Sequence, residues 1–141
     1  MILGSNQYLD EAMRKINEDE KYAKLAQGVE DSYTLVLQAQ PSKGISEDLV
    51  IGFQISKGKM TEIWLGNKKT DFILSAPYGV FVDILTGKLD VTRAFIMRKL
   101  KIEGSLARLL KTSKATEQFV EVLKTIPTEF EGEYQSRSTA S

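Results

Sequence analysis

The chain has 141 residues, and its 19 lysines and arginines balance its 19 aspartates and glutamates, so the formal net charge is zero. This length predicts one domain with a single core, and the balanced charge does not favour nucleic acid as a partner. The absence of cysteine and histidine excludes disulfides, thiolate chemistry, imidazole bases and the usual ligands of zinc and iron, so we expect no metal and no cofactor.

We expect no targeting signal from this sequence. No stretch approaches 18 apolar residues, and the apolar start at residues 1–4 is short, so the sequence predicts neither a membrane span nor secretion. The ending Thr139-Ala140-Ser141 does not match the serine-lysine-leucine signal for peroxisomes. We therefore expect a cytoplasmic protein.

The first half of the chain predicts one helix followed by four strands. Over residues 7–27 apolar side chains such as Tyr8, Ala12 and Ile16 recur at helical spacing, and Gly28 ends the pattern. The period then changes to two, which is typical of strands, and short connections favour antiparallel neighbours. The strands are expected near residues 32–38, 50–56, 60–65 and 70–76.

The second half predicts two helices, one short strand and two more helices. The helices are expected near residues 76–85, 90–97, 106–111 and 116–126, and the strand near 99–103. The polar tail at 128–141 is expected to be flexible. This order predicts a single α+β domain over residues 1–141, in which a mostly antiparallel five-stranded sheet is covered on one face by about five helices.

The stretch at residues 86–111 carries the most specific pattern. It reads Thr86-Gly87-Lys88-Leu89-Asp90, then Ala94-Phe95, then Lys99-Leu100-Lys101-Ile102-Glu103-Gly104, and finally Leu109-Leu110-Lys111. This pattern resembles the signature of the sterol carrier protein 2 family of lipid-binding domains. The chain departs from that signature twice, with Met97-Arg98 in place of glutamine-glycine and Ser105-Leu106 in place of asparagine-methionine.

The resemblance implies a hydrophobic tunnel between the sheet and the helices. It also implies intracellular binding and transfer of a fatty acid, an acyl-CoA or a sterol-like lipid, without enzymatic activity. The alternative is an accessory or oligomerisation domain of the same fold, which has lost the cavity and partners an enzyme of lipid metabolism. The sequence pattern alone does not separate a hollow core from a filled one.

Ligand-binding residues are expected on the apolar faces that border such a tunnel. They are Trp64, Phe81, Ile84, Leu85, Phe95, Met97, Leu100, Ile102, Leu106, Leu109, Leu110, Phe119 and Leu123. For each of them the alternative is a place in a packed core. The last helix, 116–126, follows a polar link, and its apolar face must cover something because exposure costs about 1.5–3 kcal/mol per large side chain. We expect this helix to act as a movable cover over the tunnel.

Carboxylates are the remaining candidates for catalysis. The run Glu18-Asp19-Glu20 is typical of a solvated helix face, and Asp90 is typical of a helix cap. Asp83 lies within an apolar helix, but the apolar stripe leaves it at the edge. No nucleophile has a recognisable base, so we predict no catalytic residue.

Positive charge is concentrated in residues 88–114, which hold eight basic and two acidic residues, a net charge of +6. Lysines and arginines near an anionic bilayer each contribute about 1 kcal/mol of binding, so this stretch predicts a surface that docks on anionic membranes. The residues expected there are Arg93, Arg98, Lys99, Lys101, Arg108 and Lys111. The alternative is a solvated face that is balanced by the acidic first and last helices.

Overall fold

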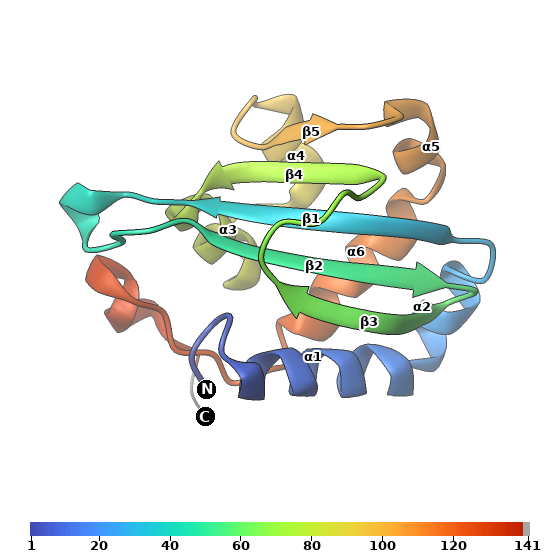
Figure 1. Ribbon diagram of the computed structural model, residues 1–141, viewed down its shortest axis with the longest axis horizontal. Coiled ribbons are helices and arrows are strands. Elements are labelled where there is room, and N and C mark those ends of the chain that lie inside the picture. Colours follow the sequence, from blue (N-terminus) through green and yellow to red (C-terminus); the bar gives the residue numbers. More distant parts are fainter. Residues whose placement is uncertain (140–141) are drawn as a thin grey trace.

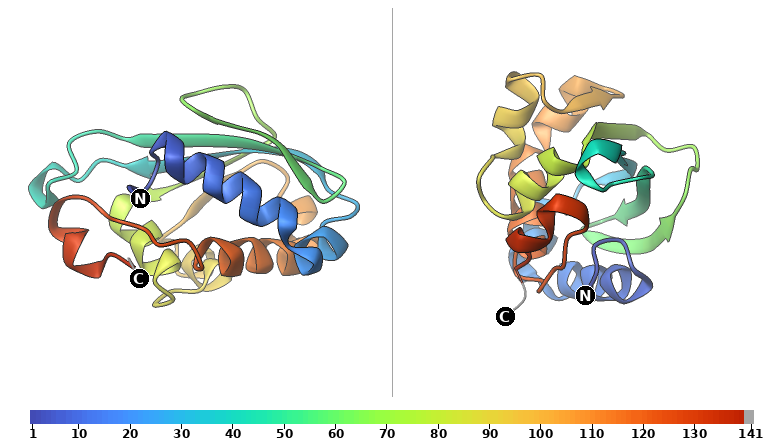
Figure 2. Two further views of the ribbon diagram at one scale, coloured as in Figure 1. Left: turned by 90° about the horizontal axis from the view of Figure 1, so that it is seen from below. Right: turned by 90° about the vertical axis from the view of Figure 1, so that its left-hand side faces the viewer.

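The computed structural model describes residues 1–139, which form one layer of strands and one layer of helices (Figures 1 and 2). The strands are β1 (Glu30–Gln38), β2 (Leu49–Ser56), β3 (Lys59–Leu65), β4 (Phe72–Pro77) and β5 (Lys101–Glu103). The α-helices are α1 (Asn6–Glu18), α2 (Glu20–Leu25), α3 (Tyr78–Leu85), α4 (Val91–Ile96), α5 (Leu106–Lys111) and α6 (Ser113–Leu123). Two 3-10 helices, η1 (Pro41–Lys43) and η2 (Gly132–Arg137), complete the order. The predicted fold class is confirmed.

The sheet has the strand order β3-β2-β1-β4-β5, and three of its four pairings are antiparallel. The exception is β4, which lies parallel to β1. The expectation that consecutive strands are neighbours is therefore wrong for β3 and β4. The connection between them crosses the outer face of the sheet (Figure 2). There the Thr70 and Thr34 hydroxyls form a hydrogen bond of 2.7 Å, and the Asp71 carboxylate accepts a hydrogen bond from the Ser32 amide at 2.8 Å.

The strands bury one face against the helices because their side chains alternate. On β1, Leu35 and Leu37 face the helices, whereas Thr34 lies under the β3–β4 connection on the other face. Trp64 also lies on the outer face, since its indole packs against Gly52 of the neighbouring strand. A side chain at Gly52 would collide with this ring.

The N-terminal helical region is two helices, not the one that its apolar spacing predicts. The backbone is extended at Asp19, and the Asp19 carboxylate accepts a bond from the Tyr22 amide at 2.8 Å. This capping bond starts α2 at Glu20. The same carboxylate accepts from the Gln118 side chain at 3.0 Å, so the break ties the first two helices to α6.

The tail is folded over residues 128–139, in contrast to the flexible tail that its polar composition suggests. Phe130 is buried, the Tyr134 hydroxyl donates to the Gln40 side chain at 3.0 Å, and Arg137 lies 2.7 Å from Asp83. Asp83, considered above as a catalytic carboxylate, is thus the ion-pair partner of the tail. The last two residues of the predicted tail, 140 and 141, lie outside the described residues.

Candidate functional site

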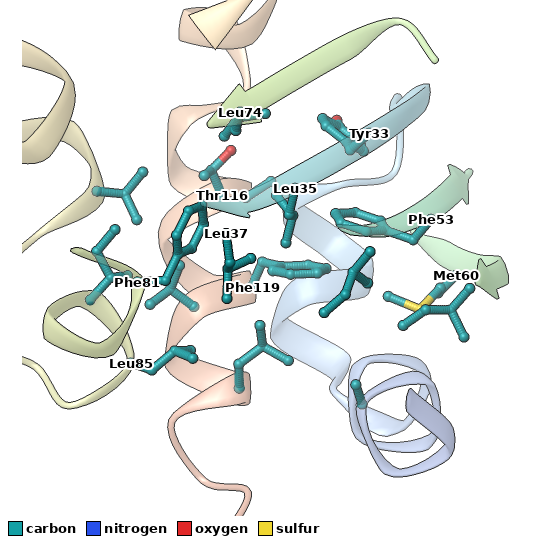
Figure 3. A pocket seen from close by; sticks show the side chains of 18 of the residues that line it. Tyr33, Leu35, Leu37, Phe53, Met60, Leu74, Phe81, Leu85, Thr116 and Phe119 are labelled. Carbon is teal, nitrogen blue, oxygen red and sulfur yellow. The ribbon is translucent and has the colours of Figure 1, made fainter. Parts of the chain in front are cut away.

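An apolar cavity of about 120 Å³ lies between the helix-facing side of the sheet and the helices (Figure 3). Strand residues form one wall, and they include Tyr33, Leu35, Leu37, Ile51, Phe53, Met60, Ile63 and Leu74. The opposite wall comes from the helices, with Leu9, Ala12, Phe81, Ile84, Leu85, Leu109, Ala115, Phe119, Val120 and Leu123 among its residues. In Figure 3 the Leu35, Leu37 and Phe119 side chains point toward the same space from opposite layers.

The few polar groups in the cavity wall are uncharged hydroxyls. Thr112 and Thr116 donate theirs to backbone carbonyls one turn back along the chain, at 3.0 and 3.3 Å. The remaining hydroxyls belong to Tyr8, Tyr22 and Tyr33. Burial raises the pKa of each of these tyrosines, and the Asp31 carboxylate raises that of Tyr33 further. The tyrosines therefore stay neutral at physiological pH, and the wall suits an apolar ligand.

Aromatic rings form a continuous row from the sheet to α6. Phe72, Tyr33, Phe53 and Phe119 stack in that order, with centroid separations of 5.4, 4.9 and 4.9 Å. Tyr22 meets Phe119 edge to face at 5.8 Å. Such ring pairs contribute about 0.5–1.5 kcal/mol each beyond their buried area, so Phe119 anchors the middle of α6 to the sheet.

A second, open groove of about 610 Å³ lies outside α6, next to the loop that leads into α4. Its lining shares three apolar side chains with the cavity, namely Ile84, Val91 and Val120. These three side chains belong to α3, α4 and α6 respectively. They therefore border both the cavity and the groove.

Seven of the thirteen predicted ligand residues line the cavity: Phe81, Ile84, Leu85, Leu100, Leu109, Phe119 and Leu123. The other six do not line it: Trp64, Phe95, Met97, Ile102, Leu106 and Leu110. Met97, Leu106 and Leu110 are exposed to solvent, and Trp64 lies on the opposite face of the sheet. The apolar pattern predicted these helices but not which side of them meets the cavity.

The predicted ligand-binding residues do not include the residues of β1 to β4 that line the cavity, or its tyrosines. Tyr33, Leu35 and Leu37 alternate with Thr34 and Val36 along β1, and this period of two was sufficient to place them on one face. The same alternation puts Trp64 on the face opposite Ile63. Whether the lining residues contact a ligand stays a prediction.

All six predicted docking residues are exposed: Arg93, Arg98, Lys99, Lys101, Lys111 and Arg108. The sixth, Arg108, differs because its guanidinium forms an ion pair with the buried Asp31 carboxylate and lies 3.8 Å from Asp71. The guanidinium also lies over the Phe72 ring, 5.1 Å from its centre. Arg108 therefore fastens α5 to the sheet.

Residues 1–139 contain no cluster of three or more acidic side chains arranged to hold a metal ion. Over the same residues no helix is long and apolar enough to cross a membrane.

Comparison with known proteins assigns the family. The model of the SCP-2 sterol transfer family matches residues 9–117, more than half of the chain. The chain belongs to this family. The resemblance seen in residues 86–111 is thus confirmed. Family membership indicates lipid binding and transfer as the general function. A search of curated proteins gave no significant match.

Solved structures of SCP-2 proteins share the fold of this chain. A crystal structure of sterol carrier protein 2 is 24% identical, covers 88% of this chain and 98% of its own, and superposes with a TM-score of 0.81. A conserved hypothetical protein of Thermus thermophilus, described as possibly a sterol carrier protein, is 24% identical, with 88% and 89% covered and a TM-score of 0.79. Sterol carrier protein 2 of Aedes aegypti, solved with the C16 fatty acid palmitate, is 18% identical, with 83% and 97% covered and a TM-score of 0.52.

Proposed function

We propose that this protein binds one apolar lipid, such as a fatty acid, in the cavity between its sheet and its helices and transfers it between membranes. The observation that carries the proposal is the cavity wall, whose side chains are apolar apart from neutral hydroxyls. The wall has no charged side chain that could act on a substrate, so we propose a carrier and not an enzyme. A fatty acid is bound by the Aedes aegypti protein of the same fold.

The size of the cavity implies that its walls move when a lipid enters. Ligand pockets usually enclose about 300–1,000 Å³, and the cavity measures about 120 Å³. Ile84, Val91 and Val120 line both the cavity and the outer groove, so we place the route of entry between them. We propose that α6 moves away from α4 at this place, which is how it would act as a cover.

The same small volume favours a second candidate function. A cavity of about 120 Å³ accommodates a small apolar molecule without rearrangement, and a wall that did not yield would exclude a long lipid chain. The protein would then be an accessory or oligomerisation domain that partners an enzyme of lipid metabolism. Lipid binding in solution decides between the two functions.

The test is a titration with a fluorescent long-chain fatty acid. We expect saturable binding near one molecule per chain, and we expect Leu35→Trp to abolish it because the larger side chain fills the cavity. Leu65→Trp is the matched control, since Leu65 is exposed and lies outside the cavity lining. Ala115→Leu, a smaller insertion into the α6 wall, repeats the test if Leu35→Trp does not fold.

Two results would contradict the proposal. If folded Leu35→Trp and Ala115→Leu both bound the fatty acid like the unmodified protein, the ligand would occupy another site. If the unmodified protein showed no saturable binding, the carrier function would fail and the accessory function would stand.

A further inference from the structure

Large apolar side chains are exposed along one edge of the sheet, where α4, β5 and α5 follow one another (Figure 1, top). Seven large apolar side chains are exposed among the described residues, and four lie in this short segment: Ile96 at 71%, Met97 at 48%, Leu106 at 39% and Leu110 at 54%. Leu106 and Leu110 are four residues apart and so share one face of α5. We refer to the exposed residues of this segment as the β5 edge.

The β5 edge is also basic. Arg93, Arg98, Lys99, Lys101 and Lys111 are exposed, and within residues 1–139 no acidic group lies in ion-pair contact with any of them. On the same segment Asp90 accepts the Arg93 amide at 3.0 Å as the cap of α4, and Glu103 is exposed on β5. The edge therefore combines exposed apolar side chains with unbalanced positive charge.

The same short segment forms part of the cavity wall. Val91, Leu100 and Leu109 line the cavity from α4, from the turn before β5, and from α5. Ile96, Met97 and Leu110 lie on the solvent side of the same elements. A partner bound at the β5 edge is therefore separated from the cavity by a single layer of short helices.

We infer that the β5 edge docks on the surface of an anionic lipid bilayer, with Ile96 and Met97 entering the headgroup region and the basic side chains contacting lipid phosphates. The inference builds on the proposed lipid-carrier function and names the surface by which the carrier meets its membrane. Apolar side chains flanked by lysine and arginine are typical of proteins that lie at this interface. Protein interfaces, by contrast, are depleted in lysine, and Lys99, Lys101 and Lys111 belong to this edge.

The first experiment places an environment-sensitive dye on the edge. Since the chain has no cysteine, Ile96→Cys and Leu65→Cys each give one labelling site, and Leu65 is an exposed apolar residue on β3 at the opposite edge of the sheet. With vesicles of phosphatidylcholine and phosphatidylserine, the emission of the dye at position 96 should shift to the blue, and that of the dye at position 65 should not. Vesicles of phosphatidylcholine alone should cause a much smaller shift, and added salt should weaken binding.

The second experiment reverses charges on and off the edge. Lys99→Glu with Lys101→Glu should weaken binding to the anionic vesicles at least about tenfold, because each lysine near the surface contributes about fivefold. The matched control is Lys43→Glu with Lys69→Glu, which changes the net charge equally at two exposed sites outside the β5 edge and should weaken binding far less. Equal effects of the two pairs, or equal binding to neutral and anionic vesicles, would overturn the inference.

The fatty-acid titration without vesicles separates this inference from the proposed function. Protein that binds the fatty acid but not anionic vesicles would overturn docking and leave fatty-acid binding intact, and an acidic protein partner would become the next candidate for the edge. Protein that docks through the edge but binds no fatty acid would leave docking intact and refute the carrier function. The Lys99→Glu, Lys101→Glu protein should still bind the fatty acid in solution, since neither lysine lines the cavity.

Discussion

The ion pair between Arg108 and Asp31 offers a sharp test of how α5 is held. Asp31 is 6% exposed on β1, whereas the Arg108 side chain is 50% exposed on α5. Arg108→Met keeps most of the apolar stem but leaves the buried carboxylate without its partner. Breaking a fully buried pair in this way costs about 3–5 kcal/mol. Because solvent reaches the arginine and screens the charge, we expect a loss of about 2–3 kcal/mol.

This loss should appear in urea unfolding as a lower midpoint at an unchanged slope. In thermal unfolding it corresponds to a decrease of about 5–10 °C for a chain of this size. Asp31→Asn in the Arg108→Met background should recover part of the stability because it removes the unpaired charge, and the two single variants complete the cycle. A loss below about 0.5 kcal/mol, the range of ordinary surface substitutions, would refute a structural role and leave Arg108 available for membranes.

Three further predictions concern the helix break, the tyrosines and α6. Asp19→Ala should lower the free energy of unfolding in urea by about 1–2 kcal/mol, because α2 loses its cap and α6 loses a hydrogen bond. The control Asp10→Ala, on the exposed surface of α1, should change it little. Equal losses in the two variants would contradict the capping role. Burial raises the pKa of Tyr8, Tyr22 and Tyr33 above the unfolded value near 10. The free energy of unfolding should therefore be unaffected by these tyrosines below about pH 10 and should fall above it by at least about 1.4 kcal/mol per pH unit. An unchanged free energy of unfolding up to pH 11 would contradict their burial. Amide hydrogen exchange in α6 should be faster than in β1 without lipid and slower once a fatty acid is bound, and slow exchange in both states would make α6 a fixed part of the core.

Local patterns were sufficient to predict the five strands and the helices α3 to α6, but not the break between α1 and α2 or the folded tail. Apolar alternation located the strands, and the pattern at residues 86–111 located α4, β5 and α5. Local patterns did not predict that β4 would join β1 in parallel, because strand order depends on how the β3–β4 connection packs on the sheet through Thr34 and Asp71.

The site was predicted only in part for a related reason. The sequence of a short helix such as α5 shows which residues are apolar but not which side of the helix faces the core. In the structure Leu109 lines the cavity, whereas Leu106 and Leu110 are exposed. The pairing of Arg108 with Asp31 joins residues 77 positions apart, and no local spacing indicates it. The folded tail was not predicted for the same reason, because its polar side chains bind residues that are distant in the sequence, such as Gln40 and Asp83.

The most direct test of the lipid-carrier function is the position of a bound fatty acid inside the protein. Protein with isotope-labelled methyl groups is saturated with palmitate, and nuclear Overhauser effects are recorded between the acyl chain and the protein methyls. We predict effects to Leu35, Leu37, Val120 and Leu123, whose side chains line the cavity from the sheet and from α6. Saturable binding with effects only to exposed methyls such as those of Leu65, or the absence of saturable binding, would contradict the account.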